Sequence, residues 1–293
     1  MRRSALAASF VLPLLASACL PDDTRPTPGS VYVTTEASST TLEGLVTSDG
    51  WDISFRRILA GVGNMELEGP GCNSYSEARY SRLFDFTVAA EPQKVGLAYG
   101  LGDCDLQLAM RTPSDDALLG IGVTADDVER MRLEELDPWI DEPERTSVYV
   151  LGTAARDGIE KQFEWTFRER YRIDNCEPGP NGELGSELDI TGQQALLLTV
   201  VLHADELFRA SDAQDAELRF DDLADADADG DGLVTLLELD ELIAPPSVEI
   251  QADEGATATE TSVAELIYDT LVPRMARFAG GGPCKPHDDD DRR

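Results

Sequence analysis

The sequence predicts an α+β protein in which a β-sandwich-like domain, residues 31–204, precedes a helical region, residues 205–293. Up to about residue 204, short runs rich in β-branched and aromatic residues alternate with Gly, Pro, Asn and Asp. Beyond about residue 205, apolar residues recur at helical spacing instead. The chain has 293 residues, 42% of them hydrophobic, which is enough for a sizeable core.

Residues 1–19, MRRSALAASFVLPLLASAC, are typical of an exported protein. Two arginines precede an apolar stretch, and small residues follow it, as in a signal peptide. The ending ASAC resembles the lipobox of bacterial lipoproteins, although that family more often has leucine where Ala16 stands. The resemblance implies a signal peptide over 1–18 and lipidation of Cys19. Cleavage after an Ala-x-Ala sequence, without a lipid, is the alternative.

The expected location is therefore the outer membrane or cell surface of a Gram-negative bacterium, and the alternative is a periplasmic or secreted protein. Residues 19–30, rich in Pro and Asp, form a tether. We expect membrane contact only through the lipid anchor, because no later segment approaches 18 consecutive apolar residues. With 24 basic and 57 acidic residues, the net charge of −33 repels nucleic acids. A calcium ion and a protein or glycan partner remain compatible with this charge.

Four cysteines besides Cys19 indicate two disulfides, because an exported chain folds in an oxidising compartment. They are Cys72, Cys104, Cys176 and Cys284, and their spacing resembles no zinc motif. Three connectivities are open. We favour Cys72 with Cys104 and Cys176 with Cys284, which pairs neighbours within each half of the chain.

Several elements have local signals. Asp157-Gly158 lies between two segments in which apolar and polar residues alternate, and it predicts a hairpin turn. Phe163, Trp165 and Phe167 are expected on one face of the second strand. Thr124 is expected to cap a helix. Residues 195–203, ALLLTVVLH, are apolar on both faces of an extended strand and predict a central strand covered on each side.

The helical region is predicted from apolar residues on both sides of an acidic run. Ala216, Leu218, Phe220 and Leu223 precede it, and a second periodic stretch from Leu236 follows and ends at Pro245-Pro246. A further helix is expected from Ser262, which has capping-box spacing to Glu265. Its apolar stripe consists of Val263, Leu266, Ile267, Leu271, Met275 and Phe278, with a bend at Pro273 and an end at residues 280–282.

The acidic run itself reads DADADGDGLVTLLE over residues 225–238. Read from Asp227, it resembles the EF-hand calcium loop. Asp227, Asp229 and Asp231 stand at positions 1, 3 and 5, Gly232 at the sharp turn of position 6, Leu233 at the carbonyl position 7, Thr235 at position 9 and Glu238 at position 12. A frame starting at Asp225 loses the acid at position 12. The resemblance covers only about residues 214–244.

This resemblance implies a calcium ion bound by Asp227, Asp229, Asp231, the Leu233 carbonyl, Thr235 and Glu238. EF-hands usually come in pairs joined at position 8, here Val234, and the chain has no second loop. We therefore expect a structural ion rather than a calcium sensor. From Phe220 to Pro273 there are fifteen acids and no Lys or Arg, so a cation would relieve repulsion. The alternative interpretation is a solvated acidic linker.

No residue is predicted to be catalytic, since no HExxH, GxSxG, Walker or GxGxxG helix-opening motif occurs. His203, followed by Asp205 and Glu206, is compatible with a second cation site, but a structural role is favoured. His287 lies in a charged tail. Trp51, Trp139 and Trp165 are expected in the core rather than on a glycan-binding surface. The leading hypothesis is a calcium-binding structural or interaction protein. The runner-up is a calcium-dependent surface enzyme, such as a glycan hydrolase, using carboxylates of the β domain.

Overall fold

The structure is a computed structural model that describes residues 26–137, 142–244, 261–282 and 284. Its strands are β1 Gly29–Ala37, β2 Leu45–Val46, β3 Asp52–Glu68, β4 Asn73–Ser76, β5 Ala78–Asp85, β6 Gln93–Met110, β7 Leu118–Leu119, β8 Glu135–Asp137, β9 Glu142–Glu144, β10 Val148–Arg156, β11 Ile159–Phe167, β12 Tyr171–Ile173, β13 Glu187–Ile190, β14 Ala195–Leu202, β15 Leu233–Val234 and β16 Ala276–Phe278. Its helices are α1 Ser39–Glu43, α2 Ala125–Arg132, the 3-10 helix η1 Ala204–Phe208, α3 Asp221–Asp225, α4 Leu236–Asp240, α5 Val263–Glu265, the π-helix η2 Leu266–Leu271 and α6 Val272–Arg274.

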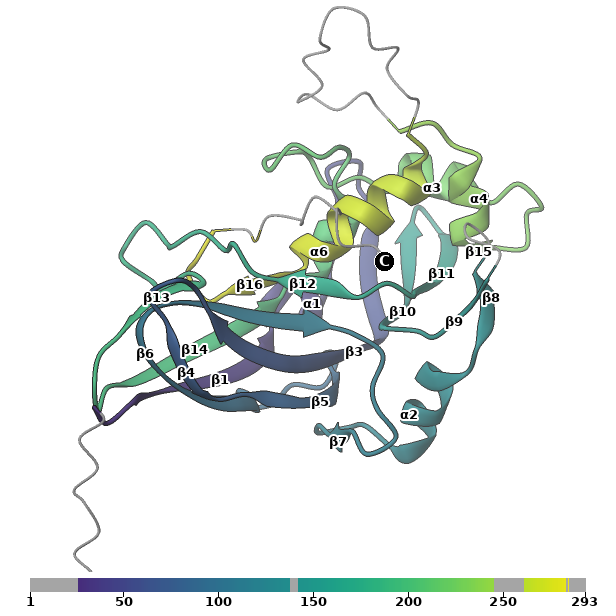
Figure 1. Cartoon of the computed structure of the whole chain (residues 1–293). Helices are drawn as coiled ribbons and strands as arrows, with labels where there is room; N and C mark the ends of the chain where they lie inside the picture. Colours follow the sequence, from purple (N-terminus) through teal and green to yellow (C-terminus); the bar gives the residue numbers. More distant parts are fainter. Residues whose placement is uncertain (1–25, 138–141, 245–260, 283, 285–293) are drawn as a thin grey trace, which may run out of the picture.

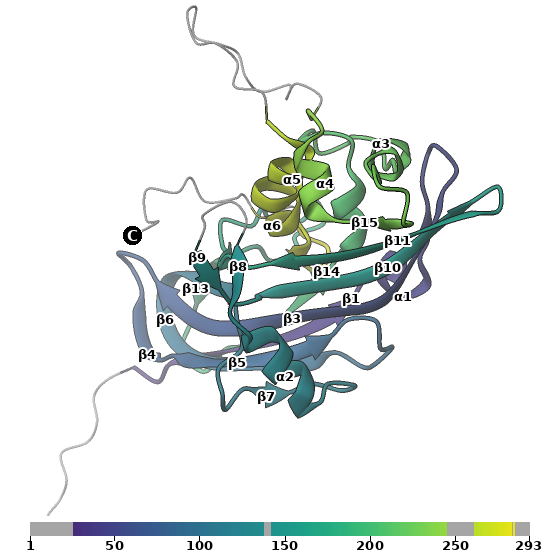
Figure 2. The same ribbon diagram turned by 90° about the vertical axis from the view of Figure 1, so that its right-hand side faces the viewer.

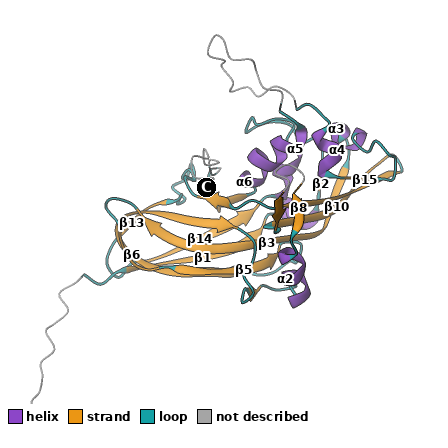
Figure 3. Ribbon diagram, turned by 45° about the vertical axis from the view of Figure 1, so that its right-hand side comes forward, coloured by secondary structure: helices purple, strands orange, loops and turns teal. Residues whose placement is uncertain are grey.

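The fold is predominantly β, which confirms the predicted β region, but in place of two stacked sheets it has one large curled sheet (Figures 1 and 3). Hydrogen bonds connect 14 strands, and the main path runs β15-β11-β10-β3-β6-β1-β14-β16. Strands β8 and β9 form a separate pair. The C-terminal helices lie on one side of the sheet, and α2 lies on the other (Figure 2).

Two long strands explain why the sheet curls instead of splitting. Strand β3 has 17 residues and β6 has 18, and each is bonded to different partners along its length. Where β3 pairs with β6, the register shifts between Gly63 and Glu66, and it also shifts where β1 pairs with β6. Such bulges bend a strand and increase its twist. Sequence alternation identifies the strands but does not locate these bends.

The hairpin and the helix capped by Thr124 form as predicted. Strands β10 and β11 pair from Val148↔Phe167 to Arg156↔Ile159, and Asp157 and Gly158 have φ values of 52° and 83°. Thr124 caps α2 in a reciprocal capping box with Asp127. The three aromatic residues of β11 are fully buried, and Trp51 is buried as well. Trp139 lies outside the described residues.

The C-terminal region shares the core of the sheet. Buried residues of α3, β15, α4 and the segment after Ser262 belong to the same hydrophobic cluster as Phe163, Trp165 and Phe167. Phe220 contacts Trp51 at 5.2 Å and Phe208 at 5.9 Å between ring centroids. The helical region therefore packs directly on the inner face of the sheet.

This region is less helical than its periodicity predicts. The helix expected before the acidic run is limited to α3, and the segment after Ser262 begins with the predicted capping box but becomes a π-helix and ends at Arg274. Phe278 is buried as expected, yet it lies in β16, paired with Val200 of β14. The edge of β14 offers backbone partners that the apolar pattern does not reveal.

Strand β14 differs from the prediction of a strand covered on both sides. It pairs in parallel with β1 on one edge and antiparallel with β16 on the other. One of its faces is buried, but on the opposite face the Leu197 side chain is 65% exposed. Apolar residues on both faces of a strand are therefore insufficient to show that both faces are covered.

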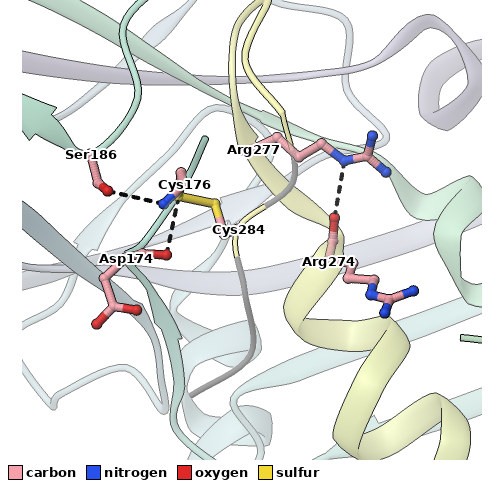
Figure 4. The surroundings of a disulfide bond; sticks show 6 residues. All are labelled: Asp174, Cys176, Ser186, Arg274, Arg277 and Cys284. Carbon is pink, nitrogen blue, oxygen red and sulfur yellow. Dashed lines mark hydrogen bonds between the residues drawn. A yellow bond between two sulfur atoms is a disulfide. The ribbon is translucent and has the colours of Figure 1, made fainter. Parts of the chain in front are cut away.

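Two disulfides, Cys72–Cys104 and Cys176–Cys284, match the favoured pairing. Cys176 lies beyond β12, its backbone N–H donates to Ser186 Oγ at 2.9 Å, and it forms a β-bridge with Cys284 (Figure 4). The Cys176–Cys284 disulfide therefore connects the segment after β16 to the sheet. Two disulfides indicate an oxidising, extracytoplasmic environment. Among the described residues, no helix has the length and apolar character of a membrane span.

Candidate metal centre and neighbouring cleft

The acidic run begins with α3, whose start is fixed by a residue distant in sequence. The backbone N–H groups of Phe220 and Asp221 both donate to Asp49 Oδ2, each at 2.8 Å. Burial alone would raise the pKa of Asp49, but hydrogen bonds from Thr47 and from these two N–H groups lower it below its ordinary value. Asp49 therefore acts as a remote N-cap for the helix that leads into the loop.

The loop after α3 turns on two glycines. Gly230 and Gly232 have φ values of 74° and 86°, a conformation that residues with a Cβ adopt only with strain. The aspartates bind backbone N–H groups ahead of them in the chain. Asp227 accepts from Gly230 at 2.8 Å and from Gly232 at 2.9 Å, and Asp231 accepts from Leu233 at 2.7 Å. These bonds wrap the loop inward.

The turn brings Asp227, Asp229 and Asp231 together. One carboxylate oxygen from each lies within 4.8 Å of the others. Carboxylate oxygens are the donors that hard divalent cations prefer. The structure therefore contains a cluster that can hold a metal ion, and it is formed by the residues at loop positions 1, 3 and 5. It is the only cluster of this kind among the described residues.

Asp227 also contacts an ammonium group from the sheet. The Lys161 Nζ donates to Asp227 Oδ2, and the Asp227 side chain is 0% exposed whereas that of Lys161 is 19% exposed. The hydrogen bond from Lys161 is the largest influence on the Asp227 carboxyl and lowers its pKa, with the Gly232 and Gly230 N–H groups acting in the same direction. The carboxylate at position 1 is thus held in its charged form.

Strand β15 connects the loop to the sheet. Leu233 and Val234 pair in parallel with Gln162 and Phe163 of β11, and the Gln162 N–H donates to the Gly232 carbonyl at 2.7 Å. The Trp165 indole N–H donates to the Val234 carbonyl at 3.0 Å. In paired EF-hands the residue at position 8 meets a second loop. Here Val234 meets the edge of the β-sheet instead.

The last two predicted ligands cap the next helix. Thr235 is the N-cap of α4, and Glu238 Oε2 accepts from the Thr235 N–H at 2.8 Å and from its hydroxyl at 2.9 Å. Glu238 does not belong to the three-carboxylate cluster. Leu233 lies in β15, so its backbone is fixed by the register with β11. The three aspartates offer the oxygen donors that a hard cation prefers, whereas Glu238 at position 12 is engaged in capping α4.

The second candidate site does not form. Asp205 accepts from the Thr40 hydroxyl at 2.6 Å and lies 3.8 Å from His203 Nδ1, whereas Glu206 pairs with Arg209 and Arg277. Burial lowers the pKa of His203, and Arg277 lowers it further. The two carboxylates are committed to different partners, so these residues have structural roles. His287 lies outside the described residues.

A cleft of about 510 Å³ lies between α2 and strands β10 and β11. Its lining includes four carboxylates, those of Asp126, Glu129, Glu135 and Glu164. The Tyr149 hydroxyl donates to Glu164 at 2.8 Å, and the Arg130 guanidinium lies 5.7 Å from the Tyr149 ring. Burial raises the pKa of Tyr149 to about 12, and the Glu164 charge contributes.

Sequence reasoning missed Lys161 and Asp49. Lys161 could have been found, because strand alternation places it on the same face as Phe163, Trp165 and Phe167. A lysine on a core-facing side near a hairpin end requires an anionic partner. Asp49 gives no comparable signal, since its contact with α3 depends on a turn about 170 residues away in the chain.

Comparison with protein-family models, curated proteins and solved structures found no match to this chain. The likeness to an EF-hand loop therefore depends on the sequence of residues 227–238, to which the geometry adds the cluster of Asp227, Asp229 and Asp231.

Proposed function

We propose that this chain is a calcium-binding protein of the cell envelope, in which one calcium ion stabilises the loop at residues 227–238. The observation that carries the proposal is the convergence of Asp227, Asp229 and Asp231 at loop positions 1, 3 and 5. The sequence supplies the expected glycine at position 6 and glutamate at position 12. Calcium fits better than magnesium, because magnesium requires a smaller octahedral shell and retains its waters.

The ion has a structural role in this proposal. The loop is joined to β11 through β15, and α3 and α4 pack into the main core. Three carboxylates held within 4.8 Å repel one another, so a bound cation stabilises the folded C-terminal region. The role of the whole protein is structural or is an interaction with a protein or glycan partner.

Thermal unfolding tests calcium binding and the assignment of the ligands to residues 227–238. At a calcium concentration ten times Kd, native-state binding stabilises the fold by about 1.4 kcal/mol, so the melting temperature rises relative to chelator. We expect magnesium to have less effect, and Glu238→Gln and Asp229→Ala to reduce the calcium shift. Asp225→Ala is the matched control, because it removes an exposed acid two residues before the loop and leaves the calcium frame intact. An equal melting temperature in chelator and in about 5 mM calcium, above the extracellular affinity range, contradicts calcium binding.

Envelope attachment is proposed from Cys19, which lies outside the described residues. The small residues before it and the Pro- and Asp-rich tether after it support a lipidated terminus. Cells expressing the native chain are expected to incorporate a fatty-acid probe into it, and Cys19→Ser is expected to abolish labelling. Equal labelling of both chains argues for a soluble periplasmic or secreted protein.

A second candidate function is a calcium-dependent surface hydrolase acting on glycans. The cleft beside α2 favours it, because glycosidases use paired carboxylates and Glu164 has a positioned partner in Tyr149. Release of reducing ends from neutral polysaccharides, lost in both Glu164→Gln and Glu129→Gln, would support this function. Absence of hydrolysis in the native protein leaves the structural role as the proposal.

A further inference from the structure

Lys161 places a cation of the protein itself at the first carboxylate of the loop. Its Nζ donates to Asp227 Oδ2, which also accepts from the Gly232 N–H at 2.9 Å. The Asp227 side chain is fully buried by these contacts and their surroundings. The carboxylate expected to provide the first calcium ligand is therefore already paired with an ammonium group of the protein.

The position of this ammonium group is fixed by the sheet. Lys161 precedes Gln162 in β11, and Gln162 is paired with Leu233 and bonded to the Gly232 carbonyl. This register therefore fixes the backbone of Lys161 next to the loop. It shares its face of β11 with the buried Phe163 and Trp165, so its aliphatic stem lies on the core side of the strand.

We propose that Lys161 is an internal competitor that lowers the affinity of the loop for calcium. This inference rests on the proposed calcium function. A calcium ion brings two positive charges to a carboxylate that already holds an ammonium group, so the two cations repel each other across Asp227. Calcium binding must either displace Lys161 or act against its charge, and either process weakens binding. The ion-free loop gains stability from the same contact.

The test is isothermal titration of calcium into the full chain after chelator treatment. Lys161→Met retains much of the apolar stem and removes the charge, and we expect its Kd to fall by at least about fivefold. Lys161→Arg retains the charge and is expected to bind calcium no more tightly than the native chain. Lys94→Met is the matched control for net charge, because Lys94 lies over the Tyr32 ring and its strand β6 pairs with β1 there rather than with the loop. We expect less than about a twofold change for it.

Melting temperatures provide a second measurement, because a lysine with only a structural role would give the same deficit in chelator and in calcium. In chelator, Lys161→Met is expected to melt below the native chain, and in saturating calcium its deficit is expected to shrink. Should Lys161→Met fail to fold, Lys161→Gln serves in the same titration.

The outcomes separate this inference from the proposed function. If the native chain binds calcium and the neutral variants bind no more tightly, the competitor role is wrong and calcium binding stands. The competitor role is also wrong if Lys161→Arg or Lys94→Met gains as much affinity as Lys161→Met. If neither the native chain nor the neutral variants bind calcium, both the proposed function and this inference are wrong.

Discussion

At Tyr149, burial and a neighbouring carboxylate act on the same proton. The hydroxyl donates to Glu164, and ionisation would place two negative charges at hydrogen-bond distance in a partly buried position. Both effects favour the neutral phenol and raise the pKa of Tyr149 to about 12 from the ordinary value of 10.0. Tyr149 also belongs to the small hydrophobic cluster that includes Val128 and Met131 of α2, so this ionisation is coupled to the packing of that helix.

Stability is therefore expected to depend on Tyr149 at high pH. Because the folded-state pKa is raised above the unfolded value, this contribution is fully present below pH 10 and is lost as the pH rises through about 12. Denaturant unfolding across this range should give a steeper decline for the native chain than for Tyr149→Phe. Tyr99→Phe, on an exposed position of β6, is the control and should retain the native slope. Equal slopes for Tyr149→Phe and the native chain contradict this assignment.

At the scale of elements, helix starts depend on both local and remote contacts. Thr124, Thr235 and Ser262 cap their helices through residues three positions ahead. The start of α3 has no such local cap and depends on Asp49, in the turn before β3. This turn therefore controls the geometry with which the chain enters the acidic loop.

Removing the Asp49 carboxylate is expected to destabilise the fold by about 1 to 2 kcal/mol, the cost typical of a lost N-cap. Asp49→Ala leaves the N–H groups of Phe220 and Asp221 without their acceptor. The measurement is chemical denaturation in chelator. Asp52→Ala, at the exposed first residue of β3, provides a control for loss of charge nearby. A similar cost for both variants would show that charge, rather than capping, is responsible.

The elements that sequence analysis predicted are those determined by near neighbours. Asp157-Gly158 specifies its hairpin turn, and the capping boxes at Thr124 and Ser262 span only three residues. The acidic spacing likewise predicted which three aspartates would converge. The curled sheet, the exposed face at Leu197 and the strand that includes Phe278 depend on partners distant in the chain. The apolar pattern predicts that Phe278 is buried, but it does not show whether Phe278 belongs to a helix or to a strand.

At the scale of the whole molecule, the two disulfides constrain different lengths of chain. Cys72–Cys104 joins residues 32 apart, whereas Cys176–Cys284 joins residues 108 apart and encloses the acidic loop. In the chain-entropy model these closures are worth about 3.7 and about 4.8 kcal/mol respectively. The longer closure also fixes the C-terminal segment to the sheet through a β-bridge.

Removing the longer disulfide is therefore expected to cost about 1 kcal/mol more than removing the shorter one. The comparison is between Cys176→Ser/Cys284→Ser and Cys72→Ser/Cys104→Ser, measured by denaturant unfolding without reductant. Thiol titration of the denatured native protein, with Cys19 absent or lipidated, should find no free thiol. Two titrating groups, or a larger loss from the shorter disulfide, contradict this expectation.

We expect the edge of β11 beside the acidic loop to affect the solubility of the protein. Strand β11 has nine residues, and on the side away from β10 it is bonded only to two-residue β15 among the described strands. A long strand with a free edge can pair with the same strand of another molecule and begin aggregation. The acidic loop at this edge places like charges where a second molecule would approach. Two molecules at high concentration would thereby be kept from pairing through this edge.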